Sequence, residues 1–206
     1  MRGGALKTIY LVFIVVCIAA IGVLIFALTT LPPTPTPLPN QTEIKVIRVV
    51  EGNFKETDQP IIVENRKPVV YFFTTTNCHY CAKERIPLIA ALREFGEWSG
   101  LEKIKLKEIP TYSLEKATFT SDKILVRAYE LDKYELSPEE NKLYEKYNPK
   151  RTIPTLIIAG KYFRVGAYPG VHDDLKNNTY DITPSQEEEI INIATLIRSV
   201  LAEAKK

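Results

Sequence analysis

An unbroken apolar run followed closely by two cysteines constrains this chain more than any other feature. Residues 69–73 read Val-Val-Tyr-Phe-Phe, and Thr-Thr-Thr-Asn then leads to Cys78-His79-Tyr80-Cys81. A continuous apolar run is typical of a central strand that is covered on both faces. The residues after Cys78 have the apolar spacing of a helix. We therefore predict that the two cysteines lie where a buried strand gives way to a helix.

The spacing of Cys78 and Cys81 indicates thiol–disulfide exchange. A helix N-terminus carries unpaired backbone N–H groups and a partial positive charge, so a thiolate at that position is stabilised. Cys81 follows about one helical turn later, close enough to form a disulfide with Cys78. We expect Cys78 to be the exposed nucleophile that forms a mixed disulfide with a substrate, and Cys81 to resolve it. A permanently closed structural disulfide is the alternative.

The two residues between the cysteines are predicted to modulate the site. A cationic His79 would stabilise the Cys78 thiolate and make the disulfide more oxidising. The alternative is an exposed histidine with no strong electrostatic effect. Tyr80 either packs on a partner peptide or covers the start of the helix.

A zinc site is the other use of such a cysteine pair, but it needs four ligands. The chain has three cysteines and two histidines, and His172 is predicted to lie far away in a solvated loop. We predict no metal and no cofactor.

The N-terminus has the pattern of a membrane anchor. Ile9–Leu28 contains twenty uncharged, mostly apolar residues, about the ~20 that a helix needs to cross a bilayer. Arg2 and Lys7 precede this segment and no charge follows until Glu43, which places the N-terminus in the cytoplasm and the remainder outside. A cleaved signal peptide is the alternative, but its apolar region is usually only about 7–15 residues long.

A proline-rich stretch follows the apolar segment. Residues 31–39 read LPPTPTPLP, and five prolines in nine residues favour an extended spacer of ~3.1 Å per residue. The predicted organisation is a cytoplasmic N-terminus (1–7), a transmembrane anchor (8–30) in contact with lipid, a proline-rich linker (31–42) and one folded domain (43–206) outside the cell membrane.

The folded domain shows alternating strand and helix signals. Strands are predicted at 44–50, 61–63, 69–73, 104–107, 124–131, 156–159 and 162–165, and helices at 78–98, 138–147 and from 184 onward. Ser137-Pro138 and Thr183-Pro184 have the pattern of helix starts. Residues between 107 and 124 give no clear pattern. This order predicts an α/β fold with a mixed sheet and helices on both faces.

The order of elements resembles the thioredoxin superfamily, with CxxC at the first helix and Thr152-Ile153-Pro154-Thr155 before a hairpin. The match covers residues 68–100 and 142–167. The resemblance implies a thioredoxin-like fold in which the bond before Pro154 is cis and faces the two sulfurs. It also implies that Thr152, Ile153 and Pro154 bind an extended substrate strand.

The stretches 93–100 and 117–121 also look like those of a group of membrane-anchored archaeal proteins. The chain departs from the thioredoxin pattern in other places. Asn77 stands where the family usually has tryptophan, and Tyr71 or Phe72 stands where it has a buried acid. Because that acid is missing, Glu84 or water is left as the candidate that takes the proton of Cys81. About 20 extra residues separate the first helix from the next.

These observations predict a membrane-anchored thiol–disulfide oxidoreductase that exchanges disulfides with exported proteins, its partners being protein disulfides and dithiols. One alternative is a reductase for cytochrome or metal-site assembly, supplied with electrons by a membrane redox partner. Another is a non-catalytic, thioredoxin-like binding module. A net charge of +2 does not indicate a nucleic-acid partner. The abundance of Lys and Glu is the bias reported for thermophile proteins.

Overall fold

The structure is a computed structural model that describes residues 44–204. The predicted cytoplasmic segment, membrane anchor and proline-rich linker lie outside the described residues. Within 44–204, no helix combines the length and the apolar character that a membrane span requires.

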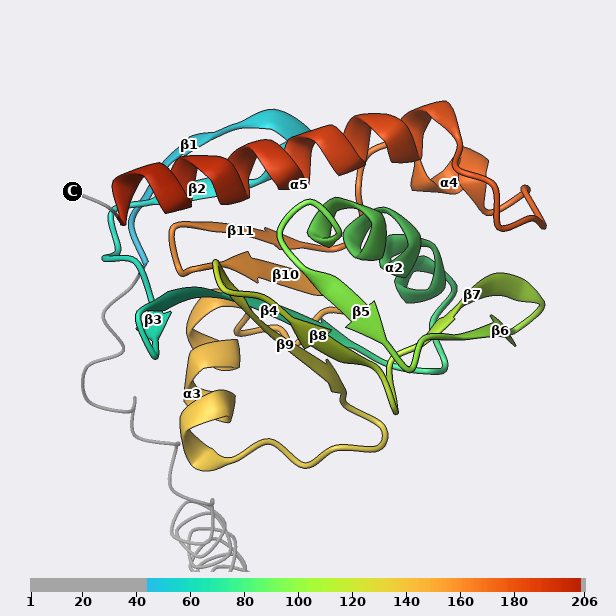
Figure 1. The fold of residues 1–206 in the computed structure, drawn as a ribbon, viewed down its shortest axis with the longest axis horizontal. Helices are drawn as coiled ribbons and strands as arrows, with labels where there is room; N and C mark the ends of the chain where they lie inside the picture. The colour runs from blue at the N-terminus through green and yellow to red at the C-terminus, as the bar shows by residue number, and fades with distance from the viewer. Residues whose placement is uncertain (1–43, 205–206) are drawn as a thin grey trace, which may run out of the picture. The chain divides into compact units, whose positions relative to one another are not determined.

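A mixed sheet of seven strands forms the framework (Figure 1). Its order is β1-β2-β11-β10-β4-β3, and β9 also pairs with β4. The strands are β1 (Val46–Val49), β2 (Lys55–Thr57), β3 (Val63–Glu64), β4 (Lys67–Thr74), β9 (Leu125–Glu130), β10 (Thr155–Ile158) and β11 (Tyr162–Val165). The β4–β9 pair is parallel and the other pairs are antiparallel.

Two antiparallel strand pairs and several helices complete the described part. The pairs are β5 (Glu97–Ser99) with β8 (Thr118–Thr120), and β6 (Glu102–Leu106) with β7 (Ile109–Ser113). The helices are the 3-10 turn η1 (Glu51–Asn53), α2 (His79–Leu92), α3 (Pro138–Tyr147), α4 (Val171–Asp174) and α5 (Pro184–Glu203).

Strand β4 is buried on both faces, which explains its unbroken apolar sequence. Side chains alternate between the two faces of a strand. Val70 and Phe72 pack in a core with residues of α2 and α5, whereas Val69 and Phe73 pack in a second core with tyrosines of α3. Figure 1 shows α2 and α5 on one side of the sheet and α3 on the other. The predicted mixed sheet with helices on both faces is confirmed.

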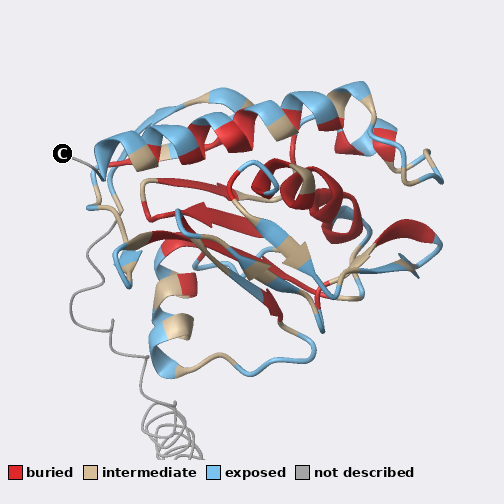
Figure 2. Cartoon of the chain, viewed as in Figure 1, coloured by how far each residue is buried: buried red, intermediate tan, exposed pale blue. Residues whose placement is uncertain are grey.

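Local capping signals explain where α3 and α5 begin. The Ser137 hydroxyl accepts a hydrogen bond from the Glu140 N–H at 3.3 Å, and the Thr183 hydroxyl accepts one from the Gln186 N–H at 3.2 Å. Both sites are capping boxes with proline in the first turn. The burial pattern in Figure 2 shows α5 buried on its inner side, whereas α2 is buried almost all round.

The predicted extension of the first helix to residue 98 is wrong, because α2 ends at Leu92 and Trp98 lies in β5. The reason is a close approach at Gly96, where an added Cβ would lie 2.7 Å from atoms of Phe119 and of Ser121. Residues 97–99 pair with β8 as strand β5, and a helix that continued to residue 98 could not make this pairing. The region 107–124, which showed no clear pattern, forms β7 and β8, and these short strands are stabilised by their pairing partners.

Candidate redox site at the start of helix α2

Cys78 is the N-cap of α2, and a disulfide joins it to Cys81. The Cα atoms of the two residues are 5.2 Å apart. The Cys78 sulfur accepts a hydrogen bond from the Cys81 backbone N–H at 3.0 Å. Cys81 is fully buried, whereas Cys78 is partly exposed. The more exposed cysteine is therefore the one at the helix N-terminus, where backbone N–H groups and the helix dipole stabilise a thiolate.

Polar contacts, exposed at Asp132 and buried at Arg85, fix the segment that leads from β4 to Cys78. The carboxylate of Asp132 accepts hydrogen bonds from the backbone N–H of Thr76 at 3.0 Å and from its hydroxyl. Arg85 is fully buried, donates to the Thr75 carbonyl at 3.2 Å and pairs with Glu130 at 2.9 Å. Burial lowers the pKa of Arg85, and the charge of Glu130 opposes this shift. The approach to the disulfide is thus anchored to the ends of β4 and β9.

Pro154 lies beside the end of β4 because its neighbour Thr155 pairs with Phe73. The Ile153–Pro154 peptide bond is cis, as the resemblance implies. The Pro154 carbonyl accepts a hydrogen bond from the Gly166 N–H at 2.8 Å. The pairing of β10 with β4 therefore brings Pro154 to the end of β4 from which the chain continues toward Cys78.

The backbone of Thr152 is bonded within the chain. Its N–H donates to Asn148 Oδ1 at 3.1 Å, and its carbonyl accepts from Asn148 Nδ2 at 2.6 Å. The backbone of Ile153 has no hydrogen-bond partner within residues 44–204. Of the three residues that the resemblance assigns to substrate binding, Ile153 has the backbone groups that remain free to pair with an added strand.

The structure places both histidines near the cysteine pair. Tyr80 is 39% exposed, its ring meets that of His172 edge-on at 5.3 Å between centroids, and its hydroxyl lies 3.4 Å from His172 Nδ1. His79 is exposed. The prediction that His172 lies far from the cysteines is wrong, because the segment after β11 folds back over the start of α2. His172 is the site residue that sequence reasoning missed, and no local pattern indicated this contact between residues 92 positions apart.

A buried ionic triad lies on the inner side of α2. Arg164, only 3% exposed, donates to Glu84 Oε1 at 2.5 Å, to Glu189 Oε1 at 2.7 Å and to the Gly52 carbonyl at 2.8 Å. The other oxygen of Glu84 accepts a hydrogen bond from the Tyr168 N–H at 3.1 Å. Two carboxyl groups thus share one guanidinium in the interior.

Burial sets the ionisation of this triad. Burial raises the pKa of Glu84, and the charge of Arg164 opposes this rise. Burial and the neighbouring charge of Glu84 raise the pKa of Glu189 to about 7. The triad is electrically neutral only while one of its two carboxyl groups holds a proton. Glu84, a candidate acceptor for the Cys81 proton, follows Cys81 by one helical turn and has both oxygens engaged.

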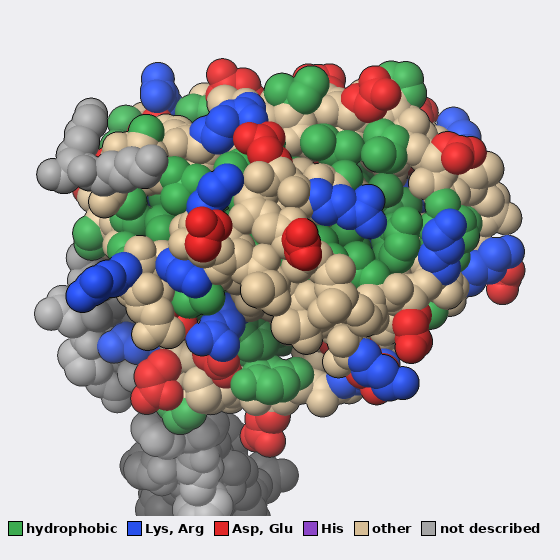
Figure 3. Space-filling view, in the orientation of Figure 1, with side chains coloured by type: hydrophobic (Ala, Val, Ile, Leu, Met, Phe, Trp, Pro, Cys, Tyr) green, Lys and Arg blue, Asp and Glu red, His purple; other side chains and the backbone are tan. Residues whose placement is uncertain are grey.

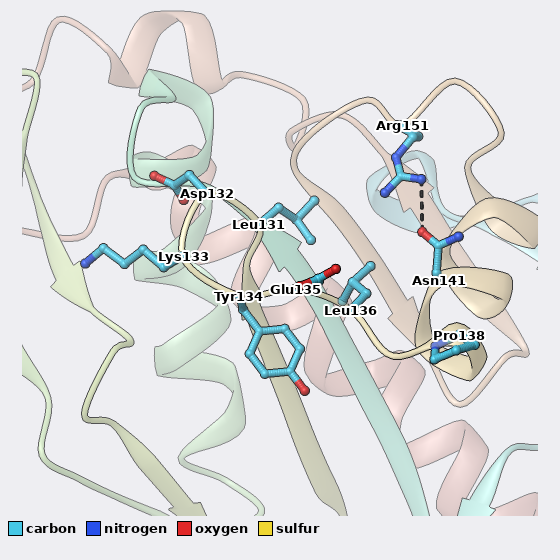
Figure 4. Close-up of a pocket in the computed structure, with 9 residues that line it drawn as sticks. All are labelled: Leu131, Asp132, Lys133, Tyr134, Glu135, Leu136, Pro138, Asn141 and Arg151. Carbon is cyan, nitrogen blue, oxygen red and sulfur yellow. Dashed lines mark hydrogen bonds between the residues drawn. The ribbon is translucent and has the colours of Figure 1, made fainter.

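A cavity of about 770 Å³ borders the same region (Figure 4). It is lined by the segment 131–136 together with Pro138, Asn141 and Arg151. Asp132 in its wall is the residue that holds Thr76. Arg151, which donates to Asn141 Oδ1 at 2.9 Å, immediately precedes Thr152. The cavity is therefore next to the segment that leads to Cys78 and next to Thr152.

The face of the described part that Figure 3 draws carries charges of both signs. Figure 3 shows Lys and Arg side chains interspersed with Asp and Glu on the face that it draws. In the described part of the chain, no three His, Cys, Asp or Glu side chains are grouped as a metal site would require. Comparisons with protein-family models, with curated proteins and with solved structures find no match to this chain.

Proposed function

We propose that this chain is a membrane-anchored thiol–disulfide oxidoreductase of thioredoxin-like fold that exchanges disulfides with exported proteins. The observation that carries the proposal is the Cys78–Cys81 disulfide at the N-terminus of α2, with Cys78 partly exposed and Cys81 buried. A cysteine pair used only to stabilise the fold has no need of this asymmetry.

The arrangement around the disulfide supports the thioredoxin-like interpretation. The parallel strand β9 and the antiparallel strand β10 flank β4, and β10 forms a hairpin with β11. Pro154 precedes β10 and lies beside the end of β4. The cis Ile153–Pro154 bond agrees with what the resemblance implies for this proline. The membrane anchor and the outward orientation are supported by the apolar segment Ile9–Leu28 and the positive charges before it.

Exchange proceeds through two displacements at sulfur. In the dithiol form, the Cys78 thiolate attacks one sulfur of a substrate disulfide, the substrate S–S bond breaks, and the departing thiolate takes a proton. A mixed disulfide now links Cys78 to the substrate. Cys81 gives up its proton and attacks the Cys78 sulfur, which releases the second substrate thiolate. The substrate gains two electrons and the chain is left with the Cys78–Cys81 disulfide; the reverse sequence oxidises a substrate dithiol.

Alkylation of the full-length chain tests the proposal. After equilibration in glutathione buffers of graded potential, free thiols are labelled and counted by mass. We expect Cys78 and Cys81 to convert together between dithiol and disulfide. We also expect Cys78→Ser to abolish exchange, and Cys81→Ser to accumulate a mixed disulfide that identifies the client. Retention of full exchange activity by Cys78→Ser would rule the proposal out.

A further inference from the structure

Two segments outside the seven-stranded sheet meet on the His79 side of the disulfide. One is the β6–β7 hairpin and the other is the segment that follows α4. The Thr111 hydroxyl in β7 donates to the Ala82 carbonyl at 2.6 Å, and Lys83 Nζ donates to the Asn177 carbonyl at 2.5 Å. Ala82 and Lys83, the two α2 residues in these hydrogen bonds, directly follow Cys81. Figure 1 shows the start of α2 between these two segments.

The two segments are also joined to each other. The Tyr180 hydroxyl donates to the Ile104 carbonyl at 2.9 Å. Lys103 Nζ lies 4.8 Å from the centre of the Tyr180 ring, and Tyr112 meets the same ring edge-on at 5.8 Å. These three contacts of Tyr180 link the hairpin to the segment after α4.

Between them is a cleft of about 370 Å³ that begins at His79. One wall is the hairpin turn with Lys107 and Glu108, the other carries Leu175 and Asn178, and Ile109 also lines it. A volume of this size accepts a few side chains. The lining combines apolar side chains with charged ones and with amides that both donate and accept hydrogen bonds, which suits a polypeptide segment. The apolar residues are Ile109 and Leu175, the charged ones Lys107 and Glu108, and the amides Asn177 and Asn178.

The position of the cleft determines what can occupy it. His79 directly follows Cys78, so any substrate sulfur that reaches Cys78 brings its neighbouring atoms to the mouth of the cleft. One residue of extended chain spans about 3.3–3.6 Å. A protein substrate therefore extends into the cleft within one or two residues of its reactive cysteine. A small disulfide carries no polypeptide segment that could enter the cleft.

We propose that this cleft binds the polypeptide segment next to the reactive cysteine of a substrate protein, and so makes the site selective for protein disulfides. The inference rests on the proposed exchange function and adds the place where the chain of the protein substrate binds. The cleft lies on the His79 side of the disulfide and is built from other residues than Thr152, Ile153 and Pro154. The contact of Tyr80 with His172 borders the disulfide as well, so the approach to Cys78 is shaped by chain segments from several elements.

Blocking the cleft tests the proposal. The variant is Asn178→Trp in the full-length dithiol form, and the matched control is Lys176→Trp, an exposed neighbour two positions away that does not line the cleft. The measurements are kcat/KM for reduction of insulin and for reduction of 5,5′-dithiobis(2-nitrobenzoate). We expect Asn178→Trp to lower kcat/KM for insulin by about tenfold or more, the loss typical of an important interface contact. The small disulfide should react within about twofold of the wild-type rate.

A second variant guards against a folding defect. Leu175→Ala removes an apolar contact without adding bulk and is expected to lower the insulin rate alone, by a smaller factor. Equal losses for both substrates in Asn178→Trp and Leu175→Ala, or unchanged insulin rates in both, would overturn the cleft proposal. A wild-type chain that reacts with neither substrate would instead overturn the exchange function, and the cleft proposal with it. Insulin-specific loss in Lys176→Trp as well would show that the effect does not belong to the cleft.

Discussion

The Glu84–Arg164–Glu189 triad makes a specific prediction about stability and pH. Glu189 is 1% exposed, and burial together with the charge of Glu84 raises its pKa to about 7. In the unfolded chain a glutamate titrates near ~4.3. Between these two values the folded state holds a proton that the unfolded state has released. The contribution of Glu189 to stability is therefore full below about pH 4.3 and is lost as the pH rises to about 7.

The size of the effect follows from the difference between the two pKa values. One unit corresponds to about 1.36 kcal/mol, so a difference of about 2.7 units corresponds to about 3–4 kcal/mol of unfolding free energy. In Glu189→Gln the triad keeps one carboxylate, Glu84, opposite Arg164 and is neutral without bound protons. We expect the variant to match the wild type near pH 4.5 and to exceed its stability by up to about 3 kcal/mol near pH 7.5.

Urea denaturation of the full-length chain at several pH values measures this, with the fluorescence of the single tryptophan, Trp98, as the signal. Glu188→Gln is the matched control, because Glu188 is exposed and adjacent in the sequence. The informative quantity is the difference between variant and wild type, since other titrating groups cancel in it. A difference that stays constant from about pH 4.5 to 7.5 would refute the assignment of a shared proton to the triad.

Three further substitutions test the packing that positions the site, each by urea denaturation at neutral pH. Arg85→Met removes the closer of the two cations that pair with Glu130, a residue that is 7% exposed, and leaves it only Lys133 at 3.7 Å. We expect a cost of about 3–5 kcal/mol, and a loss below about 1 kcal/mol would contradict the anchoring role of Arg85. Phe72→Ala empties the core between β4 and α2 and should cost about 3–5 kcal/mol, and a small effect would mean that this core is loosely packed. Gly96→Ala forces a Cβ against Phe119 and Ser121 and should cost about 1–3 kcal/mol, whereas a neutral result would contradict the close approach of this turn to β8.

The elements with strong local signals could be predicted from the sequence. Strand β4 was evident from its apolar run, and α3 and α5 from a capping residue followed by proline. The cysteine pair was correctly placed at a helix N-terminus, because the transition from strand to helix is visible locally. In each case the deciding interactions lie within a few residues of one another.

The remaining features depend on contacts between distant segments. The end of α2 is set by the packing of Gly96 against β8, and β7 and β8 are too short and polar to show a pattern of their own. The triad joins Glu84 to residues 80 and 105 positions later, and each of these charged residues alone reads as a surface residue. The contact of His172 with Tyr80 requires the path of the chain after β11, which no local pattern specifies.

The redox titration of Cys78 and Cys81 in the full-length chain tests the exchange function most directly. Catalytic pairs of this kind have reduction potentials between about −270 and −120 mV, whereas structural disulfides usually lie below about −300 mV. We expect half of the chain to be in the dithiol form at a potential within the first range, with both cysteines converting together. A pair that stays closed in buffers poised below about −300 mV would show that the disulfide stabilises the fold and exchanges with nothing.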